Sequence, residues 1–354
     1  MTIQENISLK DLTTFRTGGT ARFFAVATTV DDIREAVLFA EKNTLPMLVL
    51  GGGSNILVSD EGFNGLVLKI EIKGITWNTS GADALVTVGA GENWDDFVAA
   101  CVSRELYGLE NLSYIPGTVG AAPIQNIGAY GVEVKYFIAS VIVFDTNNKK
   151  VTTLTNAECN FSYRDSFFKK LEGKHFVVAE VVFKLKKHAT LNTSYKDVGE
   201  YARKHSIGEF SLATLREAII DIRKNKLPDW HMLGTAGSFF KNPIISKEHY
   251  DELLKKYPDL PGFPLPATSY KLQAFKIPLA WIIDNICGFR GKRVGDVGTY
   301  RNQALVLVNY GEATTKEVMS FAQAIIDDVK EKTGIVIEPE VQMVGKFAFY
   351  GEGV

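Results

Sequence analysis

The chain has 354 residues, of which 46% are hydrophobic and 23% are charged, and its 39 basic and 41 acidic side chains leave a net charge of −2. This length favours two or three domains, and the near-zero charge gives no electrostatic support for binding of nucleic acid or an anionic membrane. Because the sequence has neither a run of 18 apolar residues nor a basic-then-apolar leader, we expect no membrane span and no signal peptide.

The first predicted elements alternate between helix and strand. Residues 29–42 repeat apolar side chains at helical spacing and carry Asp31 and Asp32 in the first turn, which predicts a helix. Its buried face is expected to consist of Ile33, Ala36, Val37 and Ala40. Three short apolar runs that follow predict strands, at 47–50, 55–58 and 65–70.

Three consecutive glycines, Gly51 to Gly53, separate the first two of these strands and are followed by Ser54 and Asn55. The turn lacks the glycine at position 56 that a dinucleotide fingerprint needs, and it lacks the Gly-Lys-Ser/Thr of a Walker loop. Two interpretations remain at this point. The segment is either a tight turn between strands or a diphosphate cradle of another kind, built from backbone N–H groups.

A second glycine turn, Gly89 to Gly91, follows a strand at 86–88. Asn93 then predicts the N-cap of a helix whose buried side holds Phe97, Cys101 and Val102. Further along, residues 116–131 have no helical or strand period and contain many glycines and two prolines. A loop of this length in a compact domain is either functional or a well-packed structural loop.

The following elements are predicted with less detail. Residues 134–144 and 150–154 indicate a hairpin, and Thr155 with Glu158 indicates the capping box of a short helix. The polar stretch 186–209 is a candidate boundary, and the prolines at 258–266 predict an irregular surface loop. The remaining regular elements are predicted strands at 176–185 and 335–344 and predicted helices at 211–224 and 314–331.

Three polar residues outside the glycine loops are candidates for chemistry, and each also has a plainer explanation. Ser238 lies between Gly237 and two phenylalanines, where it is either a turn serine or a shielded proton donor. Arg164 precedes Asp165, as in a surface ion pair. Glu340 lies two residues after Glu338 on the predicted closing strand, so both side chains point the same way, as on a solvated face. The five histidines are scattered and the three cysteines have no metal-ligand spacing, so we expect no metal site and reduced core thiols.

Seven segments taken together resemble the UDP-N-acetylenolpyruvoylglucosamine reductases, and they follow that family's order from about residue 11 to 345. The matching segments are Gly51–Asn55, Ile115–Gly131, Ser162–Ser166, Lys226–Asp229, Gly237–Pro243, Gln303–Leu307 and Glu338–Val341. The stretch from Ile244 to Asp284 is similar to the type I members that carry a loop over the substrate.

The resemblance implies an α+β fold: a vanillyl-alcohol-oxidase/PCMH-type FAD-binding domain in two subdomains, at 1–75 and 76–205, and a substrate-binding domain at 206–334. The closing strand would lie at 335–354 and carry Glu340. It also implies that NADPH reduces a non-covalently bound FAD. The flavin N5 then passes hydride to C3 of the enolpyruvyl ether of UDP-N-acetylglucosamine, giving UDP-N-acetylmuramate in cytoplasmic peptidoglycan precursor synthesis, a cell-wall step on which cell shape and division depend.

By the same resemblance, Ser238 protonates C2, and Arg164 and Glu340 stabilise the negative charge that develops there. Preorganised groups of this kind typically contribute ~3–4 kcal/mol each. Glu340 would need to hold or share a proton beside a second negative charge. The residues that correspond to the family's cofactor site are Gly51, Gly52, Gly53, Ser54, Asn55, Gly117, Thr118, Gly120, Ala121, Gln125, Asn126, Gly128, Tyr130, Gly131 and Arg223. Those that correspond to its substrate site are Tyr195, Lys226, Asn242, Gln303, Phe263 and Tyr270.

The sequence departs from the family at the loop that covers the substrate. Phe263 aligns with a tyrosine of related enzymes, and Tyr270 is nearby, so either Tyr270 replaces that hydroxyl or the contact is absent. An FAD oxidase of the same fold is the alternative function, and a flavin- or sugar-nucleotide-binding regulator is a third. The glycine loops contain no His or Cys for covalent flavin attachment. We expect a monomer with a UDP-sugar substrate and with no nucleic-acid or membrane partner.

Overall fold

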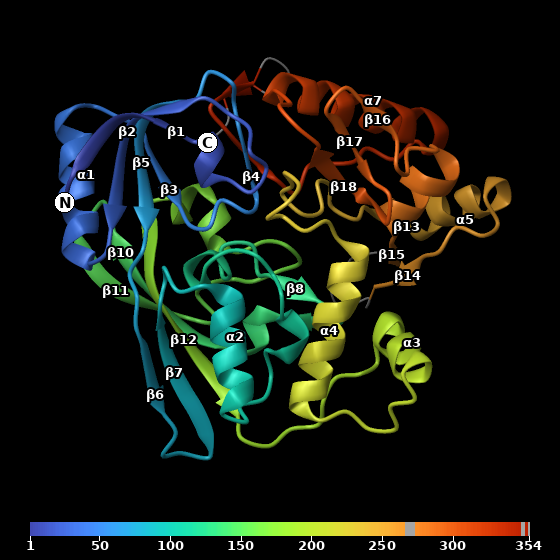
Figure 1. Cartoon of the computed structure of the whole chain (residues 1–354), viewed down its shortest axis with the longest axis horizontal. Coiled ribbons are helices and arrows are strands. Elements are labelled where there is room, and N and C mark those ends of the chain that lie inside the picture. The colour runs from blue at the N-terminus through green and yellow to red at the C-terminus, as the bar shows by residue number, and fades with distance from the viewer. Residues whose placement is uncertain (266–272, 348–350, 353–354) are drawn as a thin grey trace. The chain divides into compact units, whose positions relative to one another are not determined.

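The structure is a computed structural model that describes residues 1–265, 273–347 and 351–352. The described residues form two compact units, each built from segments that are separated in the sequence (Figure 1). The N-terminal unit contains residues 1–7, 21–53 and 63–224. The C-terminal unit contains residues 8–20 and 54–62 and the described part of 225–354.

The N-terminal unit begins with a four-stranded sheet in the order β1-β2-β5-β3, in which β5 pairs in parallel with β2 and with β3. Helix α1 (Val30–Lys42) packs beside this sheet (Figure 1). It starts at a capping box between Thr29 and Asp32, and its four predicted apolar side chains are buried, which confirms the helix and its face. The strands are β1 (Ile3–Ser8), β2 (Thr20–Ala27), β3 (Met47–Leu50) and β5 (Phe63–Ile70).

The second sheet of this unit is antiparallel throughout, in the order β11-β10-β12-β7-β6. Helix α2 (Trp94–Ser103) is capped by Asn93 as predicted, and it packs Trp94 and Phe97 against Phe183 of the sheet. Val98 rather than the predicted Val102 completes its buried face. The strands are β6 (Ile75–Asn78), β7 (Asp83–Gly89), β10 (Ile138–Asp145), β11 (Lys150–Thr155) and β12 (Phe176–Lys186).

The hairpin of β10 and β11 is confirmed, but the short helix predicted after Thr155 is wrong. The capping hydrogen bonds do form, because the Thr155 N–H and hydroxyl both donate to Glu158 Oε2, at 2.7 and 2.6 Å. The chain then turns instead of continuing as a helix, since Asn160 adopts a left-handed φ of 43°. The predicted boundary at 186–209 contains helix α3 (Lys196–Lys204), which is followed by α4 (Leu212–Lys226).

The C-terminal unit contains a parallel pair, β4 (Ile56–Val58) with β19 (Gln342–Val344), and two three-stranded sheets. Helix α7 (Thr315–Thr333) is confirmed: Thr314 and Glu317 form its capping box, and it buries Val318 and Phe321. The predicted closing strand at 335–344 is reduced to β19. The other elements are α5 (Lys247–Lys256), α6 (Leu279–Trp281), β13 (Ile244–Ser246), β14 (Phe263–Pro264), β15 (Ala274–Lys276), β16 (Arg293–Val294), β17 (Val297–Tyr300), β18 (Gln303–Asn309), β20 (Lys346–Phe347) and β21 (Gly351–Glu352).

The bounds of the two units differ from the predicted domain ranges because long-range contacts divide the chain. Residues 54–62 belong to the C-terminal unit since β4 pairs with β19, and the Ser59 N–H donates to the Val344 carbonyl at 2.8 Å. Residues 8–20 join the same unit, where the Thr235 N–H donates to the Thr14 carbonyl at 2.9 Å. Helix α4 belongs to the N-terminal unit up to Lys224, where Arg216 forms an ion pair with Asp95 at 2.7 Å.

The loop predicted to be irregular at 258–266 is only partly so. The part of this proline-rich segment that the structure describes includes the short strand β14.

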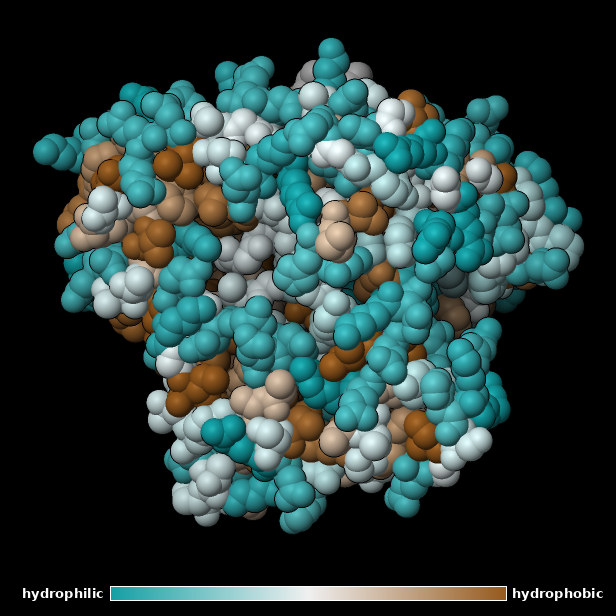
Figure 2. All heavy atoms as spheres, in the orientation of Figure 1, coloured by the Kyte–Doolittle hydropathy of each residue, from teal (hydrophilic) through white to brown (hydrophobic). Residues whose placement is uncertain are grey.

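The face visible in Figure 2 is mostly hydrophilic, with hydrophobic residues in small groups. Among the helices of the described residues, none combines the length and the apolar character needed to cross a membrane. All three cysteines are buried and unpaired, as predicted.

Candidate functional site

The triple-glycine turn packs against the long loop at 116–131 within the N-terminal unit. A Cβ atom on Gly51 would lie 2.7 Å from Thr118 Oγ1, and one on Gly52 would lie 2.7 Å from the Cα atom of Gly117. Since real Cβ atoms do not approach backbone so closely, only glycine fits at position 52 without a shift of the chain. The two loops that the sequence predicts to hold an anionic group are therefore brought together.

The second glycine turn joins the same cluster. The Gly120 N–H donates to the Ala90 carbonyl at 2.8 Å, and a Cβ atom on Gly120 would lie 2.5 Å from that of Ala90. The Trp94 N–H, at the start of α2, donates to the Gly117 carbonyl at 3.1 Å. Three glycine-containing segments thus meet in one unit. This arrangement fits a ligand that needs close backbone approach along an extended diphosphate.

Asn126 has a different part in this loop from the predicted cofactor contact. It is fully buried with a left-handed φ of 46°, and its Nδ2 donates to Glu133 Oε2 and to the Ser162 carbonyl, each at 2.8 Å. Its Oδ1 accepts the Lys135 N–H at 3.1 Å. The side chain therefore holds the loop in shape, and a cofactor contact by Asn126 stays a prediction.

Arg164 lies against the same loop. Its Nη2 donates to the Gly128 carbonyl at 2.8 Å, and its backbone adopts a left-handed φ of 53°. The buried Ser166 hydroxyl donates to the Ile124 carbonyl at 2.5 Å. Because two side chains of the 162–166 segment are bonded to two carbonyls of the 116–131 loop, the guanidinium is held beside the predicted flavin loop and is not confined to a surface ion pair with Asp165.

Tyr130, Tyr195 and Arg223 also meet in the N-terminal unit. The rings of Tyr130 and Tyr195 are T-shaped with centroids 5.3 Å apart, and Arg223 Nε donates to the Tyr114 carbonyl at 2.9 Å. Burial lowers the pKa of the Arg223 guanidinium, and nearby Tyr130 and Asp95 oppose that shift. An arginine keeps its charge under such a shift, so a cation lies on the Tyr130 side of the loop.

Ser238 and Glu340 are adjacent in the C-terminal unit although they are distant in sequence. Ser238 pairs with Val306 of β18, and the Glu340 N–H donates to the carbonyl of Phe239 at 2.8 Å. Asn55 completes the group, because its Nδ2 donates to the Glu340 carbonyl at 3.4 Å and its own carbonyl accepts the Gln342 N–H at 3.0 Å. The sequence assigned Asn55 to the cofactor and missed this link, which depends on the pairing of β4 with β19.

The other predicted substrate residues occupy several elements of the C-terminal unit. Asn242 Oδ1 accepts the Leu279 N–H at 2.9 Å and so caps the start of α6, and Gln303 begins β18. Lys226 ends α4 and is partly buried. Phe263 is 60% exposed on β14, and Tyr270 lies outside the described residues, so their covering roles stay a prediction. Five other residues are predicted to contact the cofactor. Ser54, Ala121 and Gln125 are partly buried, and Gly53 and Gly131 adopt positive φ.

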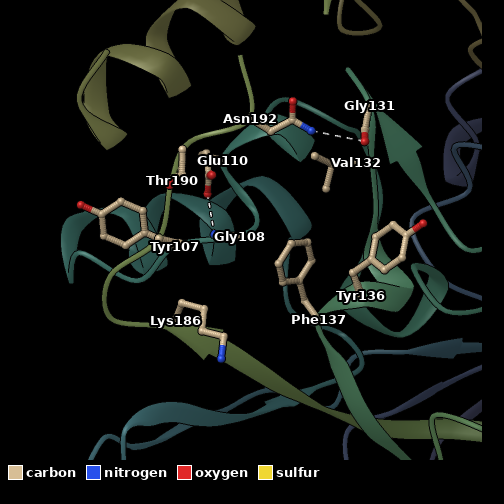
Figure 3. A pocket seen from close by; sticks show the side chains of 11 residues that line it. Tyr107, Gly108, Glu110, Gly131, Val132, Tyr136, Phe137, Lys186, Thr190 and Asn192 are labelled. Carbon is tan, nitrogen blue, oxygen red and sulfur yellow. Dashed lines mark hydrogen bonds between the residues drawn. The ribbon is translucent and has the colours of Figure 1, made fainter. Parts of the chain in front are cut away.

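A cavity of about 270 Å³ lies in the N-terminal unit beside the predicted cofactor loop (Figure 3). Gly131 is the one predicted site residue in its wall. Burial raises the pKa of Glu110, whose Oε2 accepts the Gly108 N–H at 2.6 Å. Its lining residues are Tyr107, Gly108, Glu110, Gly131, Val132, Tyr136, Phe137, Lys186, Ala189, Thr190 and Asn192. Within the described ranges, no three His, Cys, Asp or Glu residues are grouped so that they could hold a metal.

Comparison with known proteins adds to this geometry. Two family profiles match the chain: one described as "FAD binding domain" at residues 21–154, and one described as "UDP-N-acetylenolpyruvoylglucosamine reductase, C-terminal domain" at residues 228–344. The UDP-N-acetylenolpyruvoylglucosamine reductase of Flavobacterium johnsoniae is 40% identical over 97% of this chain and 100% of its own length. That of Ralstonia nicotianae is 44% identical over 92% of this chain and 95% of its own.

A solved structure agrees with these relatives. The crystal structure of UDP-N-acetylenolpyruvylglucosamine reductase from Thermus caldophilus is similar to this chain with a TM-score of 0.67 and 25% identity, over 97% of this chain and 99% of the other. The similarity therefore extends through both units, including the segments that carry the glycine turns, Arg164, Ser238 and Glu340.

Proposed function

Because the chain belongs to the UDP-N-acetylenolpyruvoylglucosamine reductase family, we propose that Arg164, Ser238 and Glu340 carry out its reaction and that the three glycine-rich segments hold its cofactor. The protein is an FAD-dependent oxidoreductase of peptidoglycan precursor synthesis, with a vanillyl-alcohol-oxidase/PCMH-type FAD-binding domain and a separate substrate domain. The observation that carries the cofactor assignment is the meeting of Gly52 with Gly117 and of Gly120 with Ala90, inside the range of the FAD-binding profile.

When bound, FAD would supply the hydride that reduces the enolpyruvyl double bond of the UDP-sugar, and NADPH would then reduce the flavin again. The residues that fit the diphosphate are those of the turn at 51–53 and the loop at 117–121, because glycine lets the backbone of both come close to a ligand. Tyr130 and Arg223 would lie beside this loop on the flavin and uridine side.

Reduction at one carbon of the substrate leaves negative charge next to a carboxylate, and this charge must be stabilised. Arg164 presents a planar guanidinium whose position is fixed by its bond to the Gly128 carbonyl. The backbone of Glu340 is held by the bond from its N–H to the Phe239 carbonyl, and its side chain would act while it holds or shares a proton, since a bare carboxylate would repel the developing charge. Fixed groups of this kind need no reorganisation as the charge forms.

The remaining step is proton delivery, which we assign to the Ser238 hydroxyl. A serine is a weak acid, so the step requires a strongly basic carbon and a site that excludes water. Its neighbours support such a site, because Phe239 and Phe240 are both fully buried and Ala236 is nearly so. Tyr195, Lys226, Asn242 and Gln303 would hold the substrate diphosphate or support the serine.

The assay that tests this function follows NADPH oxidation by the purified FAD-loaded protein with and without the enolpyruvyl ether of UDP-N-acetylglucosamine. We expect the oxidation of NADPH to depend on the sugar nucleotide, and we expect UDP-N-acetylmuramate to appear in an amount equal to the NADPH consumed. Equal rates with and without the sugar nucleotide, together with oxygen consumption, would instead establish the FAD oxidase. A protein without the absorbance bands of bound flavin would contradict both functions.

The glycine cradle gives a second prediction. Gly52→Ala places a methyl group 2.7 Å from the Gly117 backbone, and overpacking of this kind typically costs about 1–3 kcal/mol. We expect FAD to bind roughly 10-fold more weakly, measured by the quenching of flavin fluorescence on titration of the apoprotein. Gly208→Ala is the matched control, since no atom lies within 4 Å of its added Cβ. Equal FAD affinity in the two variants would exclude the 51–53 turn from the cradle.

Two coarser properties complete the proposal. We infer a monomer that works in the cytoplasm, where NADPH and UDP-sugars are available. The absence of disulfides among the three cysteines, all of them described and buried, supports a reducing compartment. Light scattering of the holoenzyme at assay concentration tests the oligomeric state.

A further inference from the structure

Asn111 is a fully buried polar residue of the N-terminal unit that the mechanism above does not use. It lies in the 3-10 turn Glu110–Leu112, whose first residue, Glu110, lines the cavity of Figure 3. Its Nδ2 donates to the carbonyl of Tyr130 at 3.1 Å and to the carbonyl of Asn192 at 2.9 Å. One amide therefore binds two chain segments that are 62 residues apart in the sequence. Among the described residues, no sheet joins these two segments.

Both of these segments lead directly to predicted site residues. Tyr130 has a left-handed φ of 47°, a conformation that a bulky residue keeps only when its surroundings enforce it. Asn192 lies three residues before Tyr195, and its own Nδ2 donates to the Gly131 carbonyl at 3.4 Å. The rings of Tyr130 and Tyr195 then meet edge to face at 5.3 Å. The backbone link through Asn111 and the ring contact thus join the same pair of residues.

We propose that Asn111 is a positioning residue that fixes Tyr130 on the flavin side and Tyr195 on the substrate side as one rigid pair. The proposal rests on the proposed function for its kinetic consequences, while the geometry that carries it is independent of that function. The amide donates to two carbonyls, those of Tyr130 and Asn192, and a carboxylate in its place would face both of them with negative charge. Replacement of Asn111 should therefore shift Tyr130 and Tyr195 together.

The experiment compares Asn111→Asp with Asn156→Asp in the FAD-loaded protein. Asn156 is a matched control, because its Nδ2 also donates to two backbone carbonyls, those of Lys135 and Ile138, at 2.8 and 2.7 Å. We expect Asn111→Asp to raise KM for the UDP-sugar about 10-fold and to shift the visible absorption and circular dichroism of the bound flavin. Asn156→Asp should alter the melting temperature without either change.

A double-mutant cycle separates positioning from simple loss of stability. If Asn111 acts through Tyr195, its effect on KM should largely disappear in a Tyr195→Ala background, since the residue it positions is then absent. Asn111→Ser keeps one hydroxyl donor and serves if the aspartate variant does not fold. An unchanged KM and an unchanged flavin spectrum in a folded Asn111 variant, or fully additive effects with Tyr195→Ala, would overturn the proposal.

These readouts also separate the proposal from the proposed function. If the wild-type protein does not turn over the UDP-sugar, the proposed function fails. The flavin spectrum and the FAD dissociation constant then decide the Tyr130 arm of the proposal alone. If the wild-type protein turns over the UDP-sugar and the Asn111 variants behave like the control Asn156→Asp, the proposed function stands and the positioning role of Asn111 fails.

Discussion

Replacement of Ser238 by alanine should leave FAD bound and reducible by NADPH while slowing reoxidation of the flavin by the UDP-sugar roughly 10²–10⁴-fold. The two half-reactions differ in what they need, because only the second must deliver a proton to substrate carbon. The backbone at this position is held by pairing with Val306 and lies between buried side chains, so removal of one oxygen should not disturb the fold. Anaerobic stopped-flow measurement of flavin absorbance follows each half-reaction separately.

Ser246→Ala is the control for this experiment. Ser246 lies in the same unit, where its hydroxyl accepts the His249 N–H at 3.2 Å and caps α5, so its loss should cost about 1 kcal/mol of stability. Flavin reoxidation in this variant should match the wild type. Normal turnover by Ser238→Ala would remove Ser238 from proton delivery, and loss of both half-reactions would indicate a cofactor or folding defect.

The sequence predicted best those elements whose ends are determined by neighbouring residues. Helices α1, α2 and α7 begin at side-chain caps, in which Thr29, Asn93 and Thr314 each accept the backbone N–H of the residue three positions later, and the cap at Asn93 forms as predicted. The same local signal was wrong at Thr155. There the cap forms, but a left-handed residue and the burial of Cys159 turn the chain away. A cap starts a helix only if the following residues can continue it.

Long-range pairing is the part that the sequence did not reveal. Nothing near residue 56 indicates that β4 pairs with a strand almost 290 residues later, and this pairing brings Asn55 into contact with the backbone of Glu340, while its cofactor contact stays a prediction. The glycine motifs did predict that these loops come close together, because a glycine is informative wherever backbone must approach backbone, while the binding of the cofactor by these loops stays a prediction. They could not indicate that the Asn126 side chain would hold the loop, since that depends on Glu133 and Ser162 folding back against it.

Arg164→Lys should lower the rate of flavin reoxidation by the UDP-sugar roughly 10²–10³-fold, again with normal reduction by NADPH. The substitution keeps the charge, so the loss measures geometry. The guanidinium donates one N–H to the Gly128 carbonyl at 2.8 Å, and its planar set of N–H groups matches the geometry of a carboxylate. A lysine is a point charge on a flexible stem and cannot keep that anchor and also present a planar fork.

The matched control for this prediction is Arg34→Lys. Arg34 also belongs to the N-terminal unit and donates through Nη1 to a backbone carbonyl, that of Lys149 at 2.6 Å, but it lies on α1 outside the predicted site. Both substitutions exchange the same chemical groups at an anchored arginine, so a shared effect would reflect stability. A selective loss in Arg164→Lys, with an unchanged FAD content, would place the guanidinium at the developing charge. Reoxidation at the wild-type rate in Arg164→Lys would exclude this role for the guanidinium. If its planar group stabilises the transition state, replacing that group must slow the reaction.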